Sequence, residues 1–240
     1  MEWYLPVIWA ALIGTAVALY VLLDGFDLGT GILFPFASTE RERDQMMDSV
    51  APFWDGNETW LVLGGGGLWV AFPQAYAVIM PALYLPVIVM LLALVFRGVA
   101  FEFRSVAVTS KKYWNFAFAA GSTVAAICQG LILGGLIQGI KVENGAFAGG
   151  SFDWVTSFAL VCGLGVLAGY ALLGATWLVM KTEGLRRRTR PRSSQAAARR
   201  RRAGAASDPR AIGSSYWLRP LRPLFRVTVR GLTHPLRFPS

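Results

Sequence analysis

Two pairs of carboxylates stand among apolar residues in the first quarter of the chain. The motif DGFDLGTG carries Asp24 and Asp27, and the motif WDGNETW carries Asp55 and Glu58. The members of each pair are three residues apart, so they share one face wherever the chain is helical. Carboxylates desolvated side by side cannot both ionise cheaply, and such groups can relay protons. For Asp24 and Asp27 the alternative is an interfacial pair that is wet and titrates normally.

These acids need polar partners if they lie in a membrane. An acidic residue near the bilayer centre costs roughly 2.5–3.5 kcal/mol on insertion scales. Asn57 lies beside Asp55 and Glu58, and Arg97 follows in the motif FRGVAFEFR. Because arginine stays charged when partly buried, Arg97 is the expected counter-ion for Asp55, Glu58 or Asp24. Its alternative role is membrane orientation alone.

Long apolar stretches must position these residues. The chain of 240 residues is 55% apolar with a mean hydropathy of +0.48, which excludes a disordered or ordinary soluble protein. Crossing a ~30 Å hydrocarbon core takes about 20 residues of helix. Stretches of that kind run over 5–23, 75–96, 114–140 and 154–180, and 51–72 is predicted as a fifth helix with an ionisable entrance. The expected fold class is an all-α integral membrane protein with about five transmembrane helices.

Basic residues in the loops predict the orientation, because Lys and Arg collect on the cytoplasmic side. Loops on the N-terminal side carry only Lys141, whereas the other loops carry most of the basic residues. We therefore expect the N-terminus outside, the four acids near the cytoplasmic face, and residues 38–50 as a cytoplasmic loop. Arg104 and Lys111 are expected to serve orientation only. The first apolar run lacks a basic leader and is expected to stay in the mature protein.

The composition changes after residue 184. Residues 1–184 hold 8 basic against 13 acidic side chains, whereas 185–240 hold 15 arginines, no lysine and one acid. We predict a domain over 1–184 and a disordered tail over 185–240. The tail is interpreted as a segment that binds anionic lipid or nucleic acid, or, the favoured interpretation, as the product of a shifted reading frame. No nucleic-acid partner and no role for His234 are assigned.

Ligands for metals and haem are scarce in the first 184 residues. They contain no histidine, and Cys128 and Cys162 lie in apolar runs. Axial haem ligands are usually His or Met, and no zinc, copper or iron–sulfur pattern occurs. We therefore expect this chain to ligate no metal, to hold no catalytic residue and to carry out no redox chemistry by itself.

Several motifs in series resemble subunit II of cytochrome bd quinol oxidase, over about 184 of the 240 residues. They are VLLDGFDLGTG (21–31), APFWDGNETWLVLGGGGL (51–68), FRGVAFEFR (96–104), the Gln129-Gly130 step and GATWLVMKTEG (174–184). The resemblance implies a bacterial inner-membrane oxidase that takes electrons from quinol and reduces oxygen to water with cytoplasmic protons. It also implies that haem b, haem d and the quinol-oxidation site belong to the partner, subunit I. A small single-span subunit is a further partner to consider.

By that resemblance, Asp24, Asp27 and Asp55 are assigned to proton uptake. Glu58 occupies a variable place in its motif, and Arg97 matches the family's arginine and is expected to tune the acids. Some members also hold a quinone in this subunit. The family fold has two four-helix bundles plus one helix, nine spans in all, and the resemblance ends after the fifth span.

Two other functions compete with this one. An independent proton- or cation-coupled transporter would use the same acids to bind its coupling ion. A non-enzymatic scaffold would use them only to set topology.

Overall fold

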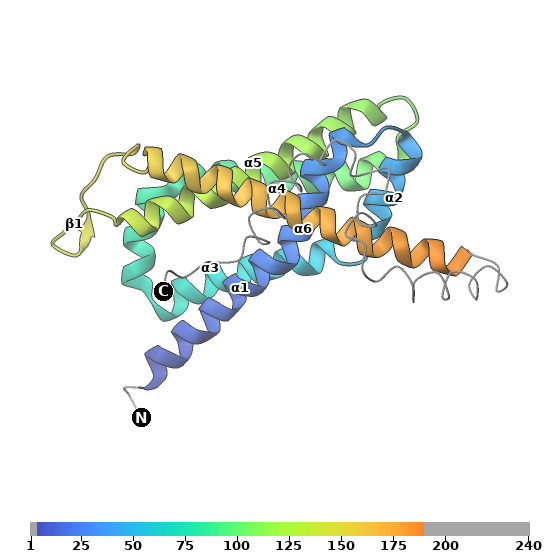
Figure 1. Ribbon diagram of the computed structural model, residues 1–240. Coiled ribbons are helices and arrows are strands. Elements are labelled where there is room, and N and C mark those ends of the chain that lie inside the picture. Colours follow the sequence, from blue (N-terminus) through green and yellow to red (C-terminus); the bar gives the residue numbers. More distant parts are fainter. Residues whose placement is uncertain (1–3, 190–240) are drawn as a thin grey trace, which may run out of the picture. The chain divides into compact units, whose positions relative to one another are not determined.

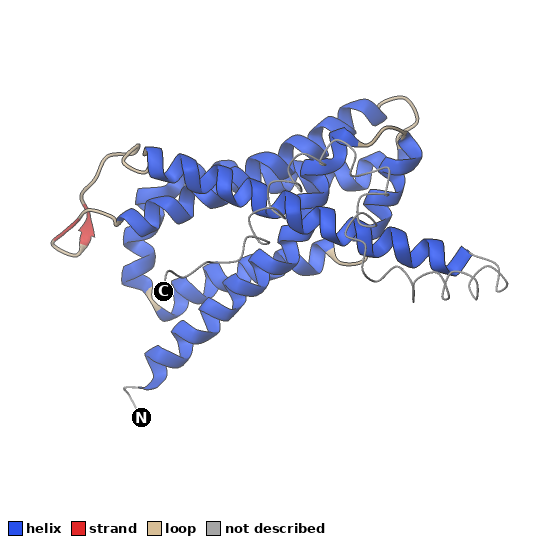
Figure 2. Ribbon diagram, viewed as in Figure 1, coloured by secondary structure: helices blue, strands red, loops and turns tan. Residues whose placement is uncertain are grey.

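The computed structural model describes residues 4–189, with side chains described through Lys181 (Figure 1). The chain divides after Leu178 into two units, and the second is described only as the end of the last helix. The elements are α1 (Tyr4–Leu33), η1 (Phe34–Phe36), α2 (Glu40–Val50), α3 (Trp54–Ala71), α4 (Pro73–Val106), α5 (Lys111–Gln138), β1 (Val142–Glu143), β2 (Ala146–Phe147) and α6 (Ser157–Thr189). Helices therefore dominate, as Figure 2 shows.

Four helical segments of the described residues are long and apolar enough to cross a membrane. They are Tyr4–Phe36, Pro73–Val106, Lys111–Gln138 and Ser157–Lys181. The prediction of an all-α integral membrane protein is confirmed. The predicted fifth segment is the helix α3, but it is not among the four, since two acids and four consecutive glycines lower the hydropathy of its 18 residues.

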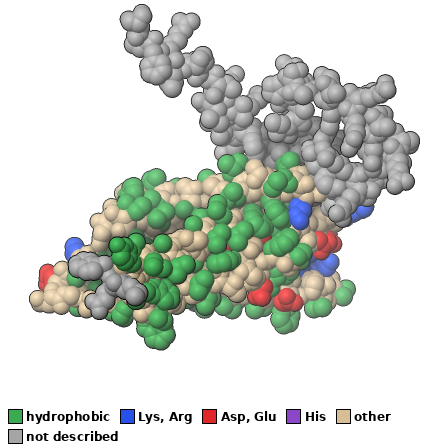
Figure 3. Space-filling view, turned by 90° about the horizontal axis from the view of Figure 1, so that it is seen from below, with side chains coloured by type: hydrophobic (Ala, Val, Ile, Leu, Met, Phe, Trp, Pro, Cys, Tyr) green, Lys and Arg blue, Asp and Glu red, His purple; other side chains and the backbone are tan. Residues whose placement is uncertain are grey.

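The helices pack through small and apolar side chains. Helix α4 lies along α5, and α1 packs against α3 and α5 (Figure 1). The core between them contains Leu28, Met90, Leu94, Ala125 and Tyr170. On the face shown in Figure 3, apolar side chains are spread over most of the surface, while the charged ones lie mainly toward its ends. Such a surface suits a lipid environment or a second apolar chain.

Helix α4 is kinked near its first third. It contains Pro81 and Pro86, and Leu83 between them has non-helical dihedral angles (φ −119°, ψ 17°). A proline inside a helix removes a backbone hydrogen bond and clashes with the preceding turn, which accounts for the kink. The C-terminal half of α4 carries Arg97 and Arg104.

The structure corrects the expected loop at 38–50, because residues 40–50 form the helix α2. Its start is a capping box: the Thr39 hydroxyl accepts from the Glu42 amide, and the Glu42 carboxylate accepts from the Thr39 amide, both at 3.3 Å. The sequence signal is Thr39 followed three residues later by glutamate. The segment is too polar to show the apolar pattern of a membrane span, so that pattern did not predict a helix here.

The ends of two predicted segments also move. Helix α1 continues past residue 23 to Leu33, so the whole DGFDLGTG motif is helical. Helix α6 runs to Thr189, beyond the predicted domain boundary at residue 184. The rest of the predicted tail, including His234, lies outside the described residues.

Candidate functional site: acids and arginine buried between α1, α3 and α4

Helix α1 carries Asp24 and Asp27 into the protein interior. Both have a relative exposure of 0%, and Thr30, one turn further, is equally buried. Because α1 remains helical through this motif, the two carboxylates share one face as their spacing predicts. Because both side chains are buried, they do not form the hydrated interfacial pair that was the alternative.

Arg97 on α4 contacts two of the acids. Its Nη1 lies 3.2 Å from Asp24 Oδ1 and 2.5 Å from Glu58 Oε1. The side-chain exposures are 2% for Arg97, 1% for Asp24 and 25% for Glu58. The guanidinium therefore joins α1, α3 and α4 in one charged cluster. It pairs with two of the three acids expected from the sequence.

Asn57 on α3 holds the remaining buried acid. Its Nδ2 donates to Asp27 Oδ2 at 2.7 Å and to the Leu23 carbonyl at 3.3 Å. Asp24 Oδ2 and Asp27 Oδ1 are buried without a hydrogen bond of ordinary geometry to any described residue. Buried carboxylate oxygens are usually paired, so each of these two oxygens could take up a proton or accept a further hydrogen bond.

The cluster, defined as Asp24, Asp27, Asn57, Glu58 and Arg97, brings three carboxyls around one guanidinium. Full ionisation would leave two buried negative charges uncompensated, which is costly. The arrangement is therefore suited to hold and release protons. No group of three or more His, Cys, Asp or Glu in the described part of the chain is arranged to hold a metal ion.

Asp55 lies apart from this cluster. It is exposed in the first turn of α3, and no hydrogen bond or ion pair joins it to another described residue. Glu58, one turn later on the same helix, is partly exposed. Of the two acids of α3, Asp55 is therefore exposed to solvent and Glu58 contacts Arg97.

Sequence reasoning missed two tyrosines next to the cluster. The Tyr170 hydroxyl donates to Gln129 Oε1 at 2.6 Å, and Gln129 Nε2 donates to the Tyr20 hydroxyl at 2.6 Å. Gln129 on α5 therefore links α1 and α6. The available signal was Tyr20, a hydroxyl one helical turn before Asp24 in an otherwise apolar segment.

The structure also corrects the role expected for Arg104, which was orientation alone. Arg104 is 3% exposed. Its guanidinium donates to Asp44 Oδ1 at 2.7 Å, to Glu40 Oε2 at 3.1 Å and to Asn115 Oδ1 at 2.5 Å. It also lies 5.3 Å from the Phe34 ring centroid. Arg104, near the end of α4, therefore connects α2 with the start of α5.

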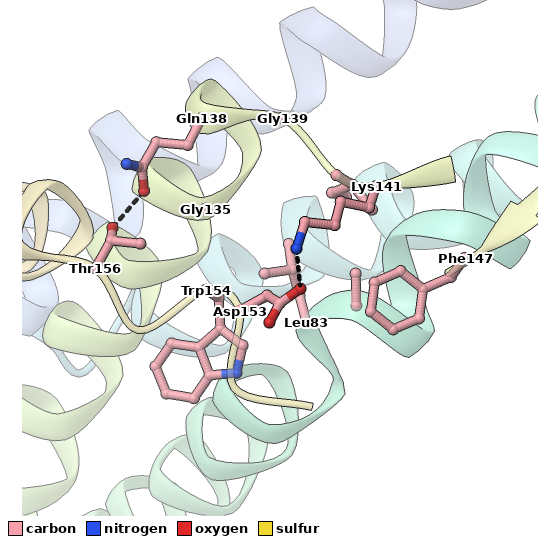
Figure 4. A pocket seen from close by; sticks show the side chains of 11 residues that line it. Leu83, Gly135, Gln138, Gly139, Lys141, Phe147, Asp153, Trp154 and Thr156 are labelled. Atoms are coloured by element: carbon pink, nitrogen blue, oxygen red, sulfur yellow. Dashed lines mark hydrogen bonds and ion pairs between the residues drawn. The ribbon is translucent and has the colours of Figure 1, made fainter. Parts of the chain in front are cut away.

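A cavity of about 290 Å³ lies at the other end of α5, beside the kink of α4 (Figure 4). Its polar side chains are already paired with one another: Lys141 with Asp153 at 3.4 Å, and Gln138 with Thr156. Apolar Leu83 forms part of the wall. The cavity therefore lacks the open buried acceptors of the acid cluster, which remains the candidate site.

Fold and site together define a helical membrane protein with a buried acid–arginine cluster shared by three helices. The model of the family described as cytochrome bd terminal oxidase subunit II matches residues 5–203. The chain belongs to this family. The match continues beyond residue 184, where the sequence resemblance was expected to end.

Curated relatives agree with the family match. The chain is 35% identical over 196 residues to "Probable cytochrome oxidase subunit 2" of Haemophilus influenzae, covering 78% of this chain and 52% of that protein. It is 34% identical over 199 residues to "Cytochrome bd-I ubiquinol oxidase subunit 2" of Escherichia coli K12, covering 79% and 52%. A Bacillus subtilis relative, "Cytochrome bd ubiquinol oxidase subunit 2", is 35% identical over 139 residues. The chain spans about half the length of the relatives from H. influenzae and E. coli.

Proposed function

We propose that the chain acts in a cytochrome bd-type terminal oxidase, which couples quinol oxidation to the reduction of oxygen to water, as the subunit that supports assembly and proton uptake. The single observation that carries this proposal is the contact of Arg97 with Asp24 and Glu58 inside the helix bundle. Burying such a charged cluster in a membrane protein costs free energy, and residues of this kind usually mark a functional site. Family membership supplies the class of reaction.

The proton route we propose follows the burial of the acids. Asp55 is exposed and would receive protons from the cytoplasm, Glu58 is 25% exposed, and Asp24 is 1% exposed. Asp27 would extend the route on the same face of α1. The Arg97 guanidinium would keep a negative charge available in the cluster while another carboxyl carries the proton.

Haem chemistry belongs, in this proposal, to a partner subunit. The described residues include no histidine, the usual axial ligand of a b-type haem, so they do not fit haem ligation by this chain. We propose that subunit I holds haem b and haem d and oxidises the quinol. We place the protein in the bacterial inner membrane with its N-terminus outside, because basic residues collect in the segments 38–50 and 97–112 and at Lys181, whereas the opposite side carries only Lys141.

Purification under mild detergent tests the proposal. An affinity tag on this chain should recover a larger, haem-bearing partner, visible in the absorbance spectrum, and quinol-driven oxygen consumption. A colourless preparation without that partner would contradict the proposal and favour the transporter alternative.

The proton role is tested in the same preparation by Asp55→Asn, with Asp48→Asn as a control because Asp48 is also exposed but lies on α2. We expect Asp55→Asn to slow oxygen consumption and alter its pH dependence, and Asp48→Asn to change neither. Equal rates and pH profiles for both variants would contradict a role for Asp55.

A further inference from the structure

A chain of hydrogen bonds leads from α6 to the buried acids. Tyr170 donates to Gln129, and Gln129 donates to Tyr20, each at 2.6 Å. Tyr20 and Tyr170 are 3% and 4% exposed, so water does not compete for these bonds. Each donation leaves the receiving group a stronger donor in turn.

The last donor in this chain is the Tyr20 hydroxyl. Its oxygen accepts from Gln129, which leaves its own hydrogen for another acceptor. Tyr20 lies four residues before Asp24 on α1, on the same face of the helix, and the two side chains interact. Asp24 Oδ2 is a buried acceptor that has no hydrogen bond of ordinary geometry to a described residue.

Two glycines of the DGFDLG motif hold the first donor in place. A Cβ on Gly25 would come within 2.9 Å of the Tyr170 ring, and a Cβ on Gly29 would overlap the Tyr170 carbonyl oxygen. The absence of side chains at Gly25 and Gly29 therefore allows Tyr170 to pack directly against the backbone of α1. This contact sets the distance from the Tyr170 hydroxyl to Gln129.

We propose that Tyr20, Gln129 and Tyr170 are positioning residues for Asp24, which they stabilise as a carboxylate through a one-way chain of donors from α6. The inference rests on the proposed function, because it assigns this task within the proton route. The chain does not itself conduct protons: a primary amide passes a proton on only through its unfavourable imidic acid form, so Gln129 orients Tyr20 instead.

Other charged or titratable groups face Asp24 and must stay unchanged in any test. They are Arg97 from α4, Glu58 from α3, Asp27 from α1 and the Tyr170 hydroxyl from α6, while α5 contributes the neutral Gln129. Conservative variants of the three proposed residues leave Arg97, Glu58 and Asp27 in place.

The test uses dicyclohexylcarbodiimide, which modifies protonated carboxyls in apolar surroundings. The full chain is labelled in membranes over a range of pH, and modification of Asp24 is quantified by peptide mass spectrometry. We expect Tyr20→Phe to increase labelling at neutral pH about fivefold, the factor that one net hydrogen bond corresponds to. Gln129→Leu should give a smaller increase and Tyr170→Phe the smallest, because polarisation weakens along the chain.

Tyr113→Phe is the matched control, since Tyr113 is 78% exposed and should label like wild type. The thermal unfolding of each variant is also recorded. A general loss of packing would lower the unfolding temperature and raise the labelling of Asp27 as well, whereas the proposed effect raises the labelling of Asp24 alone. Unchanged labelling in Tyr20→Phe, or labelling in Gln129→Leu equal to the control, would overturn the inference. Oxygen consumption is measured separately, so a failure of the oxidase proposal leaves the labelling result intact.

Discussion

Arg97 on α4 and Asp24 on α1 form an ion pair in which both side chains are almost fully buried, with exposures of 2% and 1% and an Nη1–Oδ1 distance of 3.2 Å. Removing one partner of such a pair leaves an uncompensated charge in the interior. The pair therefore joins α1 to α4 only while both members are present. This dependence can be measured.

We expect Arg97→Met to lower the free energy of unfolding by about 3–5 kcal/mol. Denaturant unfolding in mixed micelles, followed by tryptophan fluorescence, gives the value. The double variant with Asp24→Asn should recover part of the loss, because no charge is then stranded beside the missing guanidinium. A loss within about 0.5 kcal/mol, as for a typical surface substitution, would contradict the pairing.

Arg104→Met should cost less, about 1–3 kcal/mol. Its partners Glu40 and Asp44 have side-chain exposures of 47% and 46%, so water can hydrate them once the guanidinium is gone. Lys112→Met is the control, because Lys112 is exposed. The same unfolding measurement should rank Arg97→Met, Arg104→Met and Lys112→Met in decreasing order of cost, and an inverted order of the two arginines would contradict the structure.

Gly29→Ala tests the contact between α1 and α6. The added Cβ would overlap the Tyr170 carbonyl oxygen, whereas a Cβ on Gly14 of the same helix meets nothing within 4 Å. We expect Gly29→Ala to cost about 1–3 kcal/mol through overpacking. Gly14→Ala should be neutral or stabilise by up to about 1 kcal/mol. Equal stabilities of the two variants would show that the helices are not in contact at Gly29.

Glu40 gives the docking of α2 a dependence on pH. Burial acts to raise the pKa of Glu40, but hydrogen bonds from Arg43 and Asn115 outweigh it and hold the pKa below the ordinary value of 4.5. Because the folded-state pKa is depressed, the stabilisation is present above about pH 4.5 and is lost as the pH falls through the lower folded value. The unfolding temperature of wild type should therefore exceed that of Glu40→Gln at neutral pH, and the difference should shrink in acid. Asp48→Asn on the same helix is the control, and a difference that grows in acid would contradict this sign.

Composition and apolar stretches were enough to predict the membrane fold. In the bilayer core no water is present to hydrogen-bond the backbone, so a long uncharged segment satisfies its own N–H and C=O groups by forming a helix. The four spans could therefore be predicted from the sequence. The ends of the helices were harder to predict. Helix α1 runs ten residues beyond the predicted Leu23, because Gly25 and Gly29 are packed against α6 and Gly31 against α5 rather than ending the helix.

The candidate site was only partly readable for a related reason. The spacing of Asp24 and Asp27 identified one helical face, and the excess of acid identified Arg97 as a counter-ion. Which acids Arg97 meets depends on how α3 and α4 are placed against α1, a tertiary property that spacing along one helix does not contain. Asp55 and Arg104 show this limit, since one lies outside the cluster and the other has partners more than fifty residues away.

Oxygen consumption by the assembled complex carrying Asp24→Asn tests the central claim most directly. This substitution keeps the size of the side chain and removes its ability to exchange a proton, and haem content and subunit ratio show whether assembly is preserved. With both preserved, we predict that the quinol-driven rate falls at least about tenfold, equivalent to about 1.4 kcal/mol or more on the barrier, while Asp48→Asn retains the wild-type rate. A fully assembled Asp24→Asn complex that consumes oxygen at the wild-type rate across the pH range would contradict it.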